Sequence, residues 1–180
     1  MAHSAKTGIS VNYSPRAILS RPKLSGLIGA VAAEWSRVEH VLTFLYANLM
    51  GAAYLPTIAG AIPALHPIAL QVFDTLETQH HRLQLLEKLA SWVIKDPAML
   101  KSLKETVIPA IASAAKLRNT LMHANWGISA DYPDELIHNP IFGPNLVYGE
   151  SDFEEAVERA VNASKSIRAF SAEIAKVRGA

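Results

Sequence analysis

The chain has 180 residues, of which 50% are hydrophobic and 18% are charged. This length suits one domain whose core needs no disulfide or metal, and the composition excludes disordered and fibrous classes. Because cysteine is absent, disulfides, thiolate metal sites and cysteine nucleophiles are excluded, and a reducing, cytoplasmic compartment is expected. With 17 Lys+Arg against 16 Asp+Glu there is no global basic field, so any nucleic acid must meet a local site.

Two stretches must be tested as targeting or membrane segments. Residues 1–21 mix polar and basic side chains without an apolar run, which predicts a loosely held arm before a single domain over residues 22–180. The stretch from Val41 to Phe73 contains no Asp, Glu, Lys or Arg, but three prolines and two glycines divide it into pieces too short to cross a bilayer. No membrane association is therefore expected, and the apolar stretch is expected to be buried, in part by a partner subunit.

Three helices are predicted before residue 125. Apolar residues recur at alternating steps of four and three over residues 24–49, which predicts a long amphipathic helix that ends near Gly51. A second helix is expected over residues 67–95, which begin with a proline suited to a first turn. A third is expected over residues 97–124, where Pro109 should kink or split the helix because it cannot donate a backbone hydrogen bond.

The last third of the chain changes character. Residues 125–149 hold three prolines and three glycines, which predicts an ordered loop with short extended pieces at most. Ser151 and Glu154 then match a capping box, which predicts a last helix that reaches about Val177. Helices joined by short links predict an all-α, up-and-down bundle of four or five helices.

The end of the third predicted helix carries an arginine, an amide and an imidazole on one strip of its surface. At about 100° per residue, Arg118 lies at the edge of the apolar face, and Asn119 and His123 lie one turn apart beside it. Basic residues near a helix C-terminus also commonly bind the last carbonyl groups, so spacing alone leaves both a chemical role and a capping role open.

The run Arg118-Asn119-x-x-x-His123, followed by Ala-Asn-Trp-Gly, resembles the motif of HEPN domains. The segment Trp35-Ser-Arg-Val-Glu39-His-Val-Leu also resembles the corresponding helix of many such proteins. By helix order the resemblance extends over most of the chain. It implies a HEPN-like four- or five-helix bundle that pairs as a homodimer and brings two Arg/His motifs into one cleft.

The resemblance also implies an activity, a metal-independent endoribonuclease or RNA-binding protein that needs no cofactor. Some such proteins are toxins or defence factors, so an antitoxin or other partner protein is an expected partner besides RNA. Arg118 and His123 would be catalytic, and Asn119 would orient them. An imidazole suits proton transfer and a planar guanidinium suits the charge that develops on phosphorus. Two copies related by a two-fold axis would supply both an acid and a base.

Five further residues are candidates for supporting roles, each with a plainer alternative. For Glu39 the alternatives are a hydrogen bond to an inward-facing arginine and a position at the solvated edge of the helix. For His80 they are a place in the lining of the cleft and a core position in which its ring nitrogens are hydrogen-bonded. Arg82 contacts phosphate or belongs to a solvated face. Trp126 stacks on a base or anchors the following loop, and Asn125 contacts substrate or caps the helix end.

Other chemistries fit the sequence less well. Glu77-x-x-His80 has the spacing of di-iron bundles, but such sites need two of these motifs, and Glu135-x-x-His138 lies in the proline-rich loop. No metal ligands are therefore assigned, and neither a phosphate-binding glycine loop nor a Gly-x-Ser-x-Gly elbow is present. The runner-up interpretation is a non-catalytic helical dimer in which the motif binds a nucleotide or a partner protein.

Overall fold

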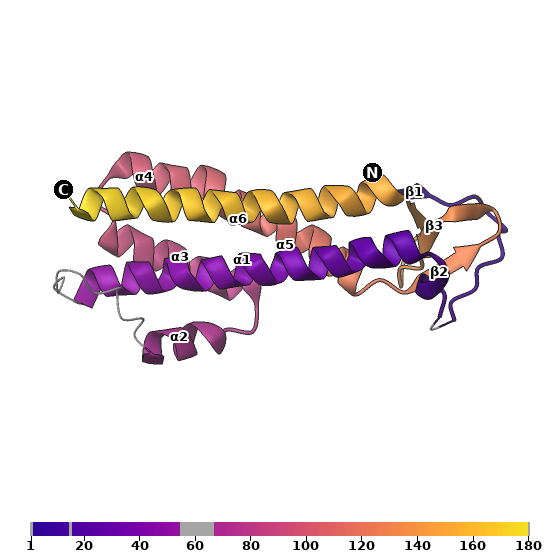
Figure 1. The fold of residues 1–180 in the computed structure, drawn as a ribbon, viewed down its shortest axis with the longest axis horizontal. Coiled ribbons are helices and arrows are strands. Elements are labelled where there is room, and N and C mark those ends of the chain that lie inside the picture. Colours follow the sequence, from indigo (N-terminus) through magenta and orange to yellow (C-terminus); the bar gives the residue numbers. More distant parts are fainter. Residues whose placement is uncertain (1, 15, 55–66, 180) are drawn as a thin grey trace. The chain divides into compact units, whose positions relative to one another are not determined.

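The computed structural model describes residues 2–14, 16–54 and 67–179, and Figure 1 labels most of the elements. In chain order these are β1 (His3–Ser4), a 3-10 turn η1 (Ile18–Ser20), α1 (Pro22–Tyr54), α2 (Pro67–Asp74), α3 (Gln79–Val93), α4 (Pro97–Ser102), a π-helical turn η2 (Leu103–Val107), α5 (Ile108–Met122), β2 (Trp126–Ser129), β3 (Tyr132–His138), β4 (Leu146–Tyr148) and α6 (Glu150–Gly179). The expected helical character is confirmed. The expectation of an all-α fold is only partly right, because a four-stranded antiparallel sheet accompanies the helices.

The chain divides into two compact units. The first contains Met1–Trp35 and Lys116–Ala160, and the second contains Ser36–Ala115 and Val161–Ala180. The helices α1, α5 and α6 contribute residues to both units, so the division does not follow the predicted boundary between an arm and a bundle.

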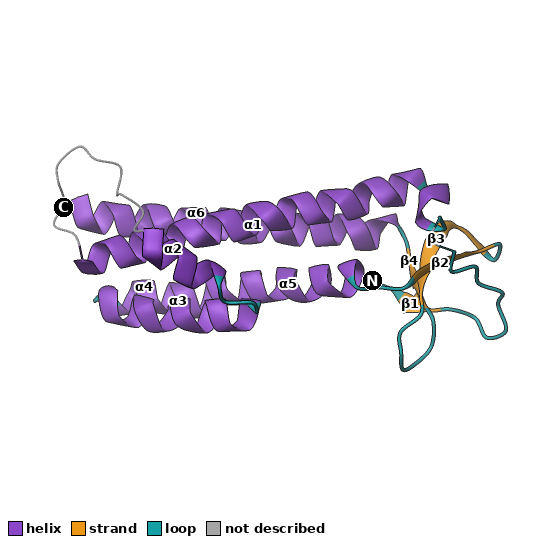
Figure 2. Cartoon of the chain, turned by 90° about the horizontal axis from the view of Figure 1, so that it is seen from below, coloured by secondary structure: helices purple, strands orange, loops and turns teal. Residues whose placement is uncertain are grey.

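The sheet of the first unit has the strand order β1-β4-β3-β2, and all of its pairs are antiparallel (Figure 2). Three of the four strands lie within residues 125–149, for which the prolines and glycines led us to predict an ordered loop with short extended pieces but no sheet. Leu136 and Ile137 of β3 pair with Tyr148 and Val147 of β4, and all four side chains are buried. These cross-strand contacts, which join residues distant in sequence, give the short segments their extended conformation.

The N-terminal segment, predicted as a loosely held arm, pairs with both edges of this sheet. At one edge β1 pairs with β4, and the amide of Ala5 donates to the carbonyl of Asn145 at 2.8 Å. At the other edge Asn12 forms a bridge with Ile128 of β2 through hydrogen bonds of 2.8 and 3.0 Å. The segment thus covers backbone groups that an open sheet edge would expose.

Gly127 sits beneath this segment and lacks room for a side chain. A Cβ atom there would lie 2.6 Å from both Tyr13 Cδ1 and Val11 Cγ1. We therefore expect Gly127→Ala to push the N-terminal segment off β2, at a cost of about 1–3 kcal/mol in the free energy of unfolding. Hydrogen exchange of residues 2–14 should speed up in this variant.

A matched control for that substitution lies in α1. Apart from its chain neighbours and the backbone of its own helix, no atom of the described residues lies within 4 Å of a Cβ built on Gly29, which is an exposed helical position. Gly29→Ala should therefore leave exchange of the N-terminal segment unchanged and raise stability by about 0.5–1 kcal/mol. Unchanged exchange of residues 2–14 in Gly127→Ala would show that the tight contact at this glycine does not hold the segment.

The helices differ from the predictions mainly at their ends. Gly51 does not end α1, which continues to Tyr54, and the predicted second helix is two helices, α2 and α3. The hydroxyl of Thr78 caps α3 by accepting a hydrogen bond from the amide of His81 at 3.2 Å. The helix predicted to kink or split at Pro109 is divided into α4 and α5 by the π-helical turn η2, which ends two residues before the proline.

Two helix starts show how local side chains set the bounds. The carboxylate of Asp96 accepts from the amide of Ala98 at 2.9 Å and caps α4, as the sequence pair Asp96-Pro97 indicates for a helix start. The capping box predicted from Ser151 and Glu154 is wrong by two residues. The amide of Gly149 donates instead to the Asp152 carboxylate at 2.9 Å, and α6 begins at Glu150.

The first unit has its own hydrophobic core. Its buried members come from α1, α5, the sheet and α6: Leu24, Val31, Leu121, Trp126, Leu136, Tyr148, Phe153 and Ala156. An exposed ion pair between Lys23 and Glu150 joins α1 to α6 at 2.5 Å. The hydrogen bond between the two side chains raises the pKa of Lys23 and lowers the pKa of Glu150.

The second unit buries much of the uncharged stretch from Val41 to Phe73. The rings of Tyr46 and Phe73 stack at 4.6 Å, and Leu42, Leu45, Leu49 and Phe73 are fully buried. The predicted burial is confirmed for these residues, although Phe44 and Val72 are 43% and 47% exposed. Residues 55–66 of the stretch lie outside the described residues. Of the helices described, none has the length and apolar character that a membrane crossing requires.

Candidate functional site

The residues of the motif lie together at the end of α5, in the first unit. The Nη1 group of Arg118 donates a hydrogen bond to the Oδ1 atom of Asn119 at 2.9 Å. The amide of His123, directly beyond the last turn, donates to the carbonyl of Asn119 at 3.1 Å. The side chains of Asn119 and His123 are exposed, and Arg118 is half-buried. The structure thus brings all three residues to one helix end.

Arg118 is held in an unusual environment. Its Nε atom is shielded from solvent and has no hydrogen-bond partner among the described residues. A buried donor without an acceptor costs about 1–3 kcal/mol where neither water nor a ligand supplies the acceptor, and Arg21, Gln79 and His138 each carry a nitrogen in the same situation. The hydrogen bond to Asn119 orients one Nη group of the guanidinium. A planar, oriented guanidinium is suited to an oxyanion such as a phosphate.

Trp126 packs in the core of the first unit. It is only 7% exposed, and its Nε1 group donates to the carbonyl of Leu121 at 3.1 Å. The rings of Tyr148 and Phe153 lie 5.1 and 5.5 Å from it, the first edge-to-face. The structure therefore gives Trp126 the anchoring role, and its buried ring offers no free face to a base.

Two titratable residues of the sheet complete this aromatic cluster. Burial raises the pKa of Tyr148, and the charge of Asp152 raises it further. The ring of His138 lies 5.9 Å from Trp126, and its Nδ1 atom is buried without a hydrogen-bond partner in the described part of the chain. Sequence reasoning considered His138 only as a metal ligand. Within residues 2–14, 16–54 and 67–179, no group of three or more His, Cys, Asp or Glu could hold a metal ion.

Asn125 connects the motif to the loop between β3 and β4. Its side chain is exposed, and its carbonyl accepts a hydrogen bond from the amide of Asn139 at 3.2 Å. The loop that begins there carries Ile141 and Phe142, which are 92% and 90% exposed. Sequence reasoning passed over these two residues. The signal that could have found them is a pair of adjacent large apolar residues between two prolines.

The remaining predicted site residues belong to the second unit. Arg82 donates from Nε to the carbonyl of Leu76 at 2.9 Å, and its guanidinium lies 5.5 Å from the ring centre of Phe73. Its Nη1 atom is 3.7 Å from the carboxylate of Glu39. The arginine that pairs with Glu39 is therefore Arg82 of α3. These contacts tie α1, α2 and α3 together. His80 is an exposed residue in the first turn of α3 and not a core residue.

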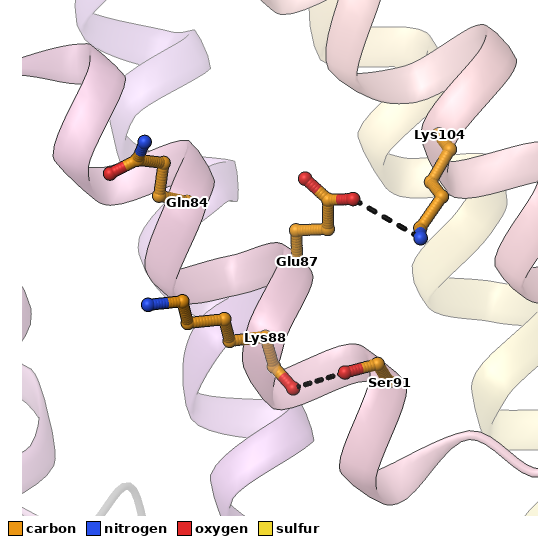
Figure 3. Close-up of a pocket in the computed structure, with 5 residues that line it drawn as sticks. All are labelled: Gln84, Glu87, Lys88, Ser91 and Lys104. Atoms are coloured by element: carbon orange, nitrogen blue, oxygen red, sulfur yellow. Dashed lines mark hydrogen bonds and ion pairs between the residues drawn. The ribbon is translucent and has the colours of Figure 1, made fainter.

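The second unit also has an open hollow of about 330 Å³ on α3 and η2 (Figure 3). Its lining is polar and consists of Gln84, Glu87, Lys88, Ser91 and Lys104. The carboxylate of Glu87 pairs with the ammonium of Lys104 at 3.2 Å, and the hydroxyl of Ser91 donates to the carbonyl of Lys88 at 2.7 Å. Glu87, Lys104 and the Ser91 hydroxyl thus bond to neighbouring groups, and none of the predicted site residues lines the hollow.

Comparison of the chain with protein-family models, with curated proteins and with solved structures finds no match in any of the three. Its function is therefore inferred from its own residues, foremost Arg118, Asn119 and His123.

Proposed function

We propose that the protein is a metal-independent endoribonuclease or RNA-binding protein of HEPN type that acts as a homodimer. The observation that carries the proposal is the hydrogen bond from Arg118 to Asn119 at the same helix end as His123. In this proposal the helices form a HEPN-like up-and-down bundle, to which the sheet is an addition. A cytoplasmic role in defence, with an antitoxin as partner, belongs to the same proposal.

The chemistry assigned to this site is cleavage of RNA by its own 2′-hydroxyl. The 2′-oxygen forms a bond to phosphorus as the bond to the 5′-oxygen breaks, which leaves a 2′,3′-cyclic phosphate and a 5′-hydroxyl. One imidazole accepts the proton of the 2′-hydroxyl and a second donates a proton to the leaving oxygen. His123 of each subunit supplies one of these groups, and Arg118 stabilises the added charge on the phosphate oxygens. Dimerisation therefore completes the site.

The test is an assay of the purified full-length chain on end-labelled single-stranded RNA and tRNA in the presence of a metal chelator. We expect cleavage under these conditions, with products that end in a cyclic phosphate. Light scattering on the same sample should give the mass of a dimer. Cleavage only after a divalent metal is added, or products with 3′-hydroxyl ends, would exclude this mechanism.

A second candidate is a non-catalytic dimer that binds a nucleotide or a partner protein through the same motif. The half-buried position of Arg118 favours it, since an arginine held by a neighbouring amide is also suited to a subunit contact. This candidate predicts that Arg118→Ala converts the dimer to a monomer and that the wild-type protein cuts no RNA with or without chelator. The two candidates thus differ in both measurements.

A further inference from the structure

The loop over residues 139–145, here called the Ile-Phe tip, displays two large apolar side chains to solvent. Ile141 and Phe142 have the highest exposed fractions, 92% and 90%, among the large hydrophobic residues described. Single exposed apolar residues are common on protein surfaces, whereas adjacent ones that are almost fully exposed mark contact sites. The pair does nothing for the core of the first unit, so it calls for an explanation outside folding.

The backbone of the tip is restricted by proline on both sides of the apolar pair. Pro140 and Pro144 fix the backbone on each side of the pair, and Gly143 has a φ of +103°, which side chains disfavour. The strands that carry the tip are paired up to its base, where His138 lies opposite Leu146. Each proline lowers the conformational entropy that the loop would lose when it binds.

The tip is attached next to the candidate catalytic residues. The hydrogen bond of 3.2 Å from Asn139 to Asn125 joins its first residue to the position two residues after His123. Phe142 follows Asn139 by three residues, which span at most about 11 Å of extended chain. All of these residues belong to the first unit. The first residue of the tip is therefore hydrogen-bonded to the chain segment that directly follows His123.

The charge of this region indicates which part of an RNA it would meet. No Asp, Glu, Lys or Arg occurs from Leu136 to Gly149, so the tip has no cation for a phosphate. An exposed aromatic ring in a neutral loop is suited to the face of a base, whereas the guanidinium of Arg118 is suited to the backbone. The aromatic ring of the tip thus suits the base of a nucleotide, and Arg118 suits its phosphate.

We propose that Phe142, flanked by Ile141, stacks on an unpaired base of single-stranded RNA beside the phosphate bound at Arg118 and His123. This inference rests on the proposed function and names its substrate class. The contact selects unpaired over helical RNA because only an unstacked base has a free face. It accepts many sequences because every base has a π-face. The pairing state of the substrate, more than its sequence, then decides where the protein binds.

The first experiment measures binding of a fluorescent single-stranded RNA by anisotropy in a His123→Ala background, where the RNA stays intact. Phe142→Ala should raise the Kd by roughly tenfold or more, and Phe142→Trp should restore tight binding because the indole also stacks. The matched control is Leu19→Ala, since Leu19 is another exposed apolar residue of the same unit, at 70%. This control should leave the Kd unchanged.

The second experiment repeats the measurement with RNAs that carry one abasic position each. When the abasic position is the one that stacks on Phe142, the protein with Phe142 should bind this RNA more weakly than the intact RNA. The Phe142→Ala protein should bind the two RNAs equally. Equal losses in both proteins would overturn the proposal. So would conversion of the dimer to a monomer by Phe142→Ala, because the tip would then be a protein contact.

The two proposals fail in different ways. If the wild type cleaves RNA but Phe142→Ala binds and cleaves as well as the wild type, base stacking is wrong and the proposed function stands. If neither the wild type nor the His123→Ala protein binds or cuts RNA, both proposals are wrong.

Discussion

Replacement of His123 by alanine is expected to lower the rate of RNA cleavage by about 10²- to 10⁴-fold, the range for loss of a general acid or base. The side chain is exposed, so its removal should leave the fold unchanged. Single-turnover cleavage of labelled RNA in chelator measures the loss. Circular dichroism and light scattering on the same sample test whether helical content and dimer mass are retained.

The chain provides matched controls for both catalytic candidates. His81, another exposed histidine, lies in the first turn of α3, and His81→Ala should cleave at the wild-type rate. Lys116 is an exposed cation on α5, two residues before Arg118, so Lys116→Ala removes one charge from the same helix without touching the motif. Arg118→Ala should lose cleavage while Lys116→Ala keeps it. Cleavage that survives in His123→Ala would make the catalytic assignment wrong.

The helices were largely predictable because their determinants are local. The spacing of apolar residues over 24–49 is sufficient for α1, and Asp96 with Pro97 is sufficient for the start of α4. The break before α3 was missed because it depends on one hydroxyl, that of Thr78, within a segment of otherwise helical spacing. Local patterns thus identified helices better than they identified helix ends.

The sheet was missed in part because one of its four strands depends on a distant partner. Strand β1 has only two residues, and its partner β4 lies near the other end of the chain. The segment Leu146–Tyr148 is too short to show alternation, and it follows a run of prolines and glycines that is typical of loops. Pairing with a distant segment gives β1 its extended conformation, whereas β2 and β3 pair across a two-residue connection, a local hairpin that the sequence analysis did not identify.

The same distinction separates the predicted site residues. Arg118, Asn119 and His123 share one helix end, so helical spacing was enough to bring them together. The partner of Glu39 could not be read in this way, because Arg82 reaches it from a different helix. The burial of Trp126 likewise depends on Tyr148 and Phe153, which follow it by more than twenty residues.

Trp126→Ala is expected to destabilise the first unit by about 3–5 kcal/mol, the range for removal of a large buried aromatic side chain. The substitution removes the ring contacts to Tyr148 and Phe153, and it also leaves the carbonyl of Leu121 without the indole donor. Because the chain has two units, hydrogen exchange of peptides from residues 116–160 is the suitable measurement. Trp92→Ala is the matched control, since Trp92 is 77% exposed, and it should change stability by no more than about 0.5 kcal/mol.

Trp126→Phe separates the two contributions of the indole. The smaller ring keeps much of the packing but cannot donate to Leu121, so its cost should lie between those of the wild type and Trp126→Ala. The same pair of variants tests the two roles considered for this residue. If Trp126 anchors the β-sheet to the end of α5, Trp126→Ala should lose RNA binding and exchange protection together. Trp126→Phe should then recover most of the RNA binding at low temperature. Normal exchange protection together with weakened RNA binding would instead mean that Trp126 leaves the core to stack on a base, which its 7% exposure contradicts.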